Sequence, residues 1–260
     1  MDETAKQERT TLNLIAVLIA LALPTLVTLI YFKWLSGYDP SVQQSAYGIG
    51  KFIQFALPVV WVLAFFRYRF NREHRRRNVE LATTKTDSMF SKLPNWLWSV
   101  GFGIDVCIIM GIALWVLSGG ELIAGLTEKV QEKVSDLGVD SVWKFAMLGV
   151  FYALVHSFLE EYYWRWFVYD LLKRFVSVPA ANVISSLGFM AHHVVLLSVY
   201  FGWTSPMTWL CSAGVAIGGM FWAWLYQRTG TLIWPWISHM VVDAGIFVVG
   251  YFLLGELFAQ

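Results

Sequence analysis

The chain has 260 residues, of which 57% are hydrophobic and only 14% are charged. Soluble domains have about 25% charged residues, so this composition excludes an ordinary soluble protein. The net charge of +1 gives no reason to expect a nucleic-acid partner. Several apolar runs approach or exceed the roughly 20 residues that cross a bilayer. The sequence therefore predicts an integral, multi-pass membrane protein.

The apolar runs predict an all-α bundle of about seven transmembrane helices, or eight. The third expected span contains a single acid, Asp105, which we interpret as a structural hydrogen-bonding group. Within the polar segment 121–140, apolar residues recur at helical spacing, which predicts an amphipathic helix on the membrane surface. The expected spans are residues 12–32, 47–66, 96–118, 142–170, 179–201, 207–226 and 232–254.

Basic residues fall mainly on one side of the bundle if seven spans alternate across the membrane. The largest group is six arginines within residues 67–77. Because basic loops are retained in the cytoplasm, we expect a cytoplasmic N-terminus and an outer C-terminus. The arginine cluster can also be read as a site for anionic lipid or an acidic partner. The short loops are compatible with a bacterial inner membrane.

Besides Asp105, ionisable residues gather inside the fourth, fifth and seventh expected spans, where each buried charge costs several kcal/mol by order of magnitude. Glu161 and Arg165 are four residues apart and share a helix face, so we interpret them as a structural ion pair. Glu160 points about 100° away from Glu161 and is available for chemistry. The full set is Glu160, Glu161, Arg165, His193, His239 and Asp243.

Three of these residues, Glu160, His193 and His239, lie at similar depth on separate spans, roughly 12–20 Å from the cytoplasmic ends. We expect them to converge on one cavity. A glutamate and a histidine that share a pocket can deprotonate a water molecule, and a second histidine can donate a hydrogen bond to an oxyanion. These parts would suffice for water attack on an amide. His156 could orient Glu160, and we interpret His192 as a core or cavity histidine.

Three motifs resemble those of the CPBP family of intramembrane proteases. This family includes type II CAAX prenyl endopeptidases and bacteriocin-processing or self-immunity proteins. Glu160, Glu161 and Arg165 resemble the EExxxR motif, and Phe189 to His193 resembles FxxxH. The segment 230–243, which ends in His239-Met-Val-Val-Asp243, resembles the last motif, HxxxN or HxxxD. The resemblance covers roughly residues 142–250.

The resemblance implies that Glu160 and His193 activate water while His239 and residue 243 stabilise the oxyanion. Prenyl endopeptidases have Asn at this last position, whereas this chain has Asp243. An ionised carboxylate cannot donate a hydrogen bond to an oxyanion. Asp243 is therefore either protonated or orients His239, and we favour the second interpretation.

The resemblance also implies a division of the chain into a variable N-terminal region, residues 1–140, and a catalytic core, residues 141–254. We expect no cofactor, because no HExxH motif is present and glutamate–histidine chemistry can act without an ion. A catalytic zinc is the alternative, with Glu160, His193 and His239 as its ligands and Asp243 also competent to bind it.

These observations favour an intramembrane endopeptidase with supporting roles for Glu161 and Arg165. Its expected partners are the lipid bilayer and a membrane-bound peptide or protein substrate, such as a prenylated tail or a precursor peptide. A non-catalytic scaffold or immunity protein is one alternative. A transporter is another, because intramembrane acids and histidines also serve proton relays. The sequence does not determine the oligomeric state.

Overall fold

The computed structural model describes residues 3–65, 93–255 and 258. Within these ranges every regular element is helical, and seven helices are long and apolar enough to cross a membrane. The expected all-α bundle of about seven spans is therefore confirmed.

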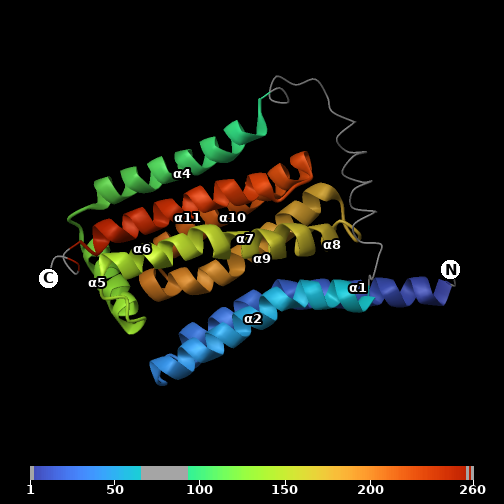
Figure 1. Cartoon of the computed structure of the whole chain (residues 1–260), viewed down its shortest axis with the longest axis horizontal. Helices are drawn as coiled ribbons and strands as arrows, with labels where there is room; N and C mark the ends of the chain where they lie inside the picture. The colour runs from blue at the N-terminus through green and yellow to red at the C-terminus, as the bar shows by residue number, and fades with distance from the viewer. Residues whose placement is uncertain (1–2, 66–92, 256–257, 259–260) are drawn as a thin grey trace. The chain divides into compact units, whose positions relative to one another are not determined.

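The described elements begin and end close to the expected spans (Figure 1). Three of the elements, η1, η3 and η4, are π-helical segments that extend or interrupt α-helices, and in them each amide bonds to a carbonyl five residues earlier. The elements are α1 (Glu3–Leu29), η1 (Ile30–Trp34), α2 (Pro40–Phe65), α4 (Asn95–Leu117), α5 (Glu121–Asp136), α6 (Val142–Val150), η3 (Phe151–His156), α7 (Ser157–Glu161), η4 (Tyr162–Tyr169), α8 (Asp170–Leu172), α9 (Val178–Phe201), α10 (Pro206–Thr229) and α11 (Ile233–Leu253).

The helices form two compact units that alternate along the sequence. Unit 1 contains α1, η1, α2, η4, α8, α9 and α10, and unit 2 contains α4, α5, α6, η3, α7 and α11. The division falls between Glu161 and Tyr162, inside the fourth span. The division expected at residue 140 separates a variable region from the region that carries the three motifs. It does not refer to compact units, and it stays a prediction.

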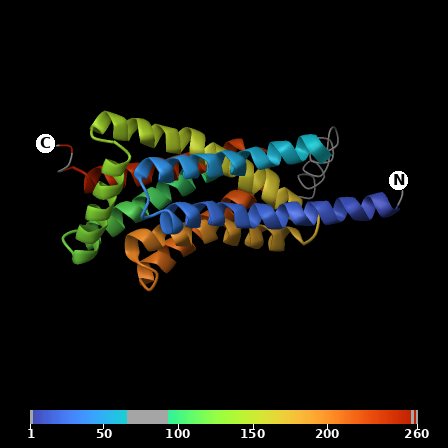
Figure 2. The ribbon, with the colours of Figure 1, turned by 90° about the horizontal axis from the view of Figure 1, so that it is seen from below.

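Unit 1 is held by close approaches of its helices. In Figure 2, α1 and α2 run side by side in opposite directions. Tyr163 of η4 donates a hydrogen bond of 2.7 Å to the Ala20 carbonyl of α1. A Cβ atom at Gly188 of α9 would lie 2.7 Å from a Leu21 side-chain atom and 3.0 Å from Trp164, so a larger residue here would displace these side chains.

Unit 2 is built on the contact between α4 and α11. Ser99 of α4 donates a hydrogen bond of 2.6 Å to the Trp234 carbonyl, and a Cβ atom at Gly103 would lie 2.8 Å from Val241. The expected amphipathic helix is α5, which runs across the long helices of this unit (Figure 2). Its Val134 is buried in a cluster with Val139, Phe145 and Leu254.

Two helices begin earlier than expected, α1 at Glu3 instead of residue 12 and α2 at Pro40 instead of residue 47. The second helix begins at Pro40, whereas the sequence interpretation placed residues 33–46 in a loop. The Asp39 carboxylate accepts hydrogen bonds from the Ser41 amide and hydroxyl, and these bonds hold the pKa of Asp39 below its usual value. A cap of this kind satisfies the first turn of a polar helix. The arginine cluster at 67–77 lies outside the described residues.

Candidate functional site

The two adjacent acids lie on α7, a short α-helical segment between the π-helical segments η3 and η4. π-helical turns inside longer helices are rare and occur frequently at functional sites. Both acids are buried, with Glu160 2% exposed and Glu161 fully enclosed. Two neighbouring buried carboxylates need hydrogen bonds or opposite charges to be stable in an apolar span.

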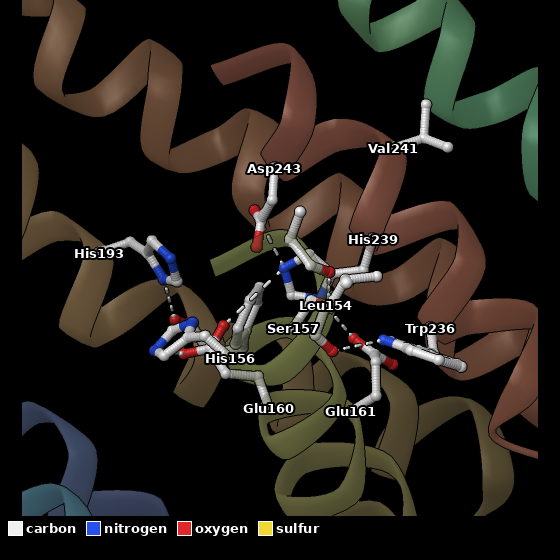
Figure 3. Close-up of polar contacts among 12 residues, drawn as sticks. Leu154, His156, Ser157, Glu160, Glu161, His193, Trp236, His239, Val241 and Asp243 are labelled. Atoms are coloured by element: carbon white, nitrogen blue, oxygen red, sulfur yellow. Dashed lines mark hydrogen bonds and ion pairs between the residues drawn. The ribbon is translucent and has the colours of Figure 1, made fainter. Parts of the chain in front are cut away.

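One such partner of the acids is His239 of α11 (Figure 3). Its Nδ1 donates a hydrogen bond of 2.9 Å to Oε1 of Glu161. Its Nε2 lies 3.6 Å from Oδ1 of Asp243 and 3.9 Å from Oε2 of Glu160. Because a carboxylate accepts at Nδ1, that nitrogen carries a proton, and Nε2 is the nitrogen that faces Glu160 and Asp243.

The carboxylate of Glu160 lies between two imidazoles. Its Oε1 is 3.7 Å from Nε2 of His156, and its Oε2 faces His239. The ring of His156 packs against Tyr152, with 4.8 Å between ring centroids. The side chains of His156 and Asp243 are 17% and 15% exposed, whereas those of the other three members are at most 5% exposed. We call these five residues, His156, Glu160, Glu161, His239 and Asp243, the acid–imidazole cluster. Within the cluster, His156 and Asp243 are the most exposed.

The geometry around His239 adds to the sequence interpretation. We expected Asp243 to orient this histidine from one turn away on the same helix. The direct hydrogen bond instead comes from Glu161, and Asp243 lies beyond hydrogen-bond length from the opposite nitrogen. Local spacing could not indicate this contact, because Glu161 and His239 are 78 residues apart.

His193 and His192 belong to α9 in unit 1. Nδ1 of His193 donates a hydrogen bond of 2.9 Å to the Phe189 carbonyl, one turn earlier in the helix. In the neutral ring this assigns the acceptor role to Nε2. His192 is buried and stacks on Trp164, with rings 5.8 Å apart and 4° from parallel. This packing agrees with its interpretation as a core histidine.

Arg165 of η4 is fully buried in unit 1. Its guanidinium lies over the rings of Phe189 and Trp222, at 5.1 and 5.6 Å from their centroids. Cation–π contacts of this kind stabilise a desolvated cation. The expected pairing of Arg165 with Glu161 stays a prediction, as does the expected convergence of His193 with Glu160 and His239.

Within the described ranges, no group of three or more His, Cys, Asp or Glu side chains has the arrangement of a metal site. Nδ1 of His239 is engaged by Glu161, so an ion could reach only its Nε2. We assign no chemical step to a metal, and the zinc alternative stays a prediction.

The fold and the acid–imidazole cluster define a polytopic α-helical membrane protein with ionisable groups gathered inside its spans. Residues 142–245 match the family model described as type II CAAX prenyl endopeptidase Rce1-like, so this part of the chain is similar to that family. The match confirms the resemblance drawn from the three motifs and supports an intramembrane protease of the CAAX type. Searches of curated proteins and of solved structures gave no match.

Proposed function

We propose that this protein is a glutamate-dependent intramembrane endopeptidase. The observation that carries the proposal is the buried carboxylate of Glu160, which lies between the imidazoles of His156 and His239 inside the family-matched segment. A buried acid in such a position can exchange a proton with a reacting water, which is the role of a general base. His193 is the proposed second group that holds this water.

In the proposed reaction, Glu160 takes a proton from water while the water oxygen attacks the carbonyl carbon of the peptide bond. The tetrahedral intermediate then collapses as Glu160 returns the proton to the leaving amine. The products are a carboxylic acid and an amine, and transfer of the acid's proton to the amine gives the carboxylate and ammonium termini. His156 is a positioning residue, because its imidazole lies 3.7 Å from the carboxylate oxygen that faces away from His239.

His239 is the proposed donor to the oxyanion. Its Nδ1 proton is held by Glu161, so Nε2 can donate only when both ring nitrogens are protonated. In that state a positive ring faces the carboxylates of Glu160, Glu161 and Asp243, which stabilises it electrostatically. Donors fixed before the reaction stabilise the developing charge without reorganisation.

The substrate that we propose is a peptide bound at the membrane. The family description supports a prenylated C-terminal peptide as one class. The presence of Asp243, where prenyl endopeptidases have Asn, favours a membrane-bound precursor peptide as the other. The proposed location is a bacterial inner membrane with the N-terminus in the cytoplasm.

The test compares wild-type protein with Glu160→Gln after reconstitution in vesicles that contain a farnesylated CAAX peptide or a membrane-anchored precursor peptide. Cleavage is measured by mass spectrometry of the fragments. We expect the variant to lose at least about 100-fold in rate, the scale of a general base, and to keep its unfolding midpoint. The matched control is Glu121→Gln, at an exposed position on α5.

Retained cleavage by Glu160→Gln would exclude the proposed base. Absence of fragments from wild-type protein with either peptide class, combined with an intact cellular phenotype of Glu160→Gln, would favour a scaffold. Proton-coupled flux without fragments would favour a transporter. A parallel assay with a zinc chelator tests the metal alternative, because a metal-dependent enzyme would lose activity and recover it when zinc is added.

A further inference from the structure

An acidic residue lies in the middle of a membrane span, away from the acid–imidazole cluster. Asp105 is the eleventh of the 23 residues of α4. At about 1.5 Å per residue it lies roughly 15 Å from the start of the helix, close to the middle of a bilayer core. Its side chain is exposed, and it makes no hydrogen bond or ion pair with any residue in the described ranges. The structural hydrogen bond that the sequence interpretation assigned to Asp105 is therefore not found within the described residues.

The two faces of α4 differ in what they contact. Ser99, Gly103 and Cys107 form one stripe, and each approaches α11. At about 100° per residue, Asp105 lies on roughly the opposite side of the helix. Its neighbours on that side include Ile108 and Ile112, which are 54% and 56% exposed. We call Gly101, Asp105, Ile108 and Ile112 the outer face of α4.

The outer face combines lipid-compatible side chains with one group that lipid solvates poorly. A carboxylate near the bilayer centre is costly, and such groups almost always face protein or water. A Cβ atom at Gly101, one turn before the acid, would meet nothing within 4 Å, so there is room for another helix at this point. Small residues of this kind let two membrane helices approach closely.

Charge complementarity selects the occupant of this face. In a two-fold dimer within one membrane, two copies of α4 would run parallel and bring both Asp105 side chains to the same depth. Two carboxylates would then meet, which is unfavourable. A different helix with Lys or Arg at that depth would pair with the acid and remove its unfavourable contact with lipid. We propose that the outer face of α4 binds a transmembrane helix that carries a basic residue near the middle of the bilayer.

The test uses labelled full-length protein in phosphatidylcholine vesicles and a synthetic single-span helix of leucine and alanine with one central Lys. Energy transfer between the labels measures association. We expect the Lys helix to bind at least about tenfold more tightly than the same helix with a central Leu, the scale of one interhelical polar contact. Asp105→Leu should abolish this preference, whereas Ile104→Ala, at an exposed position on the same helix, should keep it.

Charge reversal distinguishes direct pairing from a folding defect. The Asp105→Lys variant should no longer bind the Lys helix and should instead bind a helix with a central Glu. Equal binding of the Lys and Leu helices by wild-type protein would overturn the proposal. Self-association of the wild-type protein that depends on Asp105 would also overturn it, in favour of a second copy. This proposal does not depend on proteolytic activity, so Glu160→Gln should bind the Lys helix as the wild type does.

Discussion

The two compact units each contain a buried polar cluster, and the clusters differ in how their groups are satisfied. In unit 1, Asp170 accepts a hydrogen bond of 2.8 Å from Tyr226 and lies 2.5 Å from the Lys173 ammonium. Gln227 accepts hydrogen bonds of 3.0 Å from Tyr169 and Lys173. One negative charge is thus matched to one positive charge, with each of these contacts at hydrogen-bond length.

The acid–imidazole cluster of unit 2 has a different balance. Three carboxylates surround His239, and that of Glu161 contacts it at hydrogen-bond length. The contacts of Glu160 with the two imidazoles are 3.7 and 3.9 Å long. Contacts of this length are commonly bridged by water or shortened when a substrate binds. From this comparison we propose that the unit 1 cluster stabilises the fold and that the unit 2 cluster serves proton transfer.

The largest effect that we expect comes from breaking the ion pair in unit 1. Asp170→Asn keeps the shape of the side chain but leaves the buried Lys173 without its counter-charge. Loss of one partner of a buried pair costs about 3–5 kcal/mol of stability. Chemical unfolding in detergent micelles should show this loss, and the turnover of folded protein should stay unchanged. The double variant Asp170→Asn/Lys173→Met should recover part of the stability, and a large loss of turnover would contradict a purely structural role.

The next effect concerns the proposed oxyanion donor. His239→Gln keeps a polar side chain beside Glu161 but removes the imidazole that faces Glu160. We expect the cleavage rate to fall by about 100- to 1000-fold, as for loss of an oxyanion donor. His192→Gln is the control, because His192 stacks on Trp164 and should affect stability rather than turnover. Equal losses of turnover in both variants would remove the distinction between the two clusters.

A smaller effect is expected at Glu161, for which we propose a positioning role through its hydrogen bond with His239. In Glu161→Gln the amide oxygen can still accept the Nδ1 proton, but the negative charge is lost. We expect the turnover number to fall by about 10- to 100-fold, the scale of losing a residue that orients a reactive imidazole, with little change in KM. Steady-state kinetics separate these quantities, and a rise in KM alone would assign Glu161 to substrate binding.

The smallest effect on stability is expected at an exposed ion pair, in contrast to the buried pair of Asp170 and Lys173. Asp140 lies 2.8 Å from Lys144, whose hydrogen bond holds the pKa of Asp140 below its ordinary value of 3.8. A lowered pKa stabilises the folded state above the ordinary value, and this contribution is lost as the pH falls through the folded pKa. The difference in unfolding midpoint between wild type and Asp140→Asn should therefore be small at about pH 7 and absent at about pH 2. A difference that grows with acid would contradict this assignment.

The sequence by itself determined the membrane class, the seven spans and the three motifs whose segment, residues 142–245, matches the family model. A single hydrophobic run that crosses a bilayer is stable as an α-helix, because its backbone groups find no water there and must form hydrogen bonds within their own segment. The pairing of His239 with Asp243 on one face of α11 also followed from a spacing of four residues. These features depend on local periodicity, which the sequence displays directly.

Only the tertiary structure decided that Glu161 holds Nδ1 of His239, that Glu160 lies between two imidazoles, and that Asp105 faces outward. Each of these results depends on which helix packs against which, and on the rotation of each helix about its axis. Those quantities are set by side-chain packing between segments far apart in the chain, such as Gly103 against Val241. A run of apolar residues does not encode them, because many rotations of a uniformly apolar helix have similar hydrophobicity.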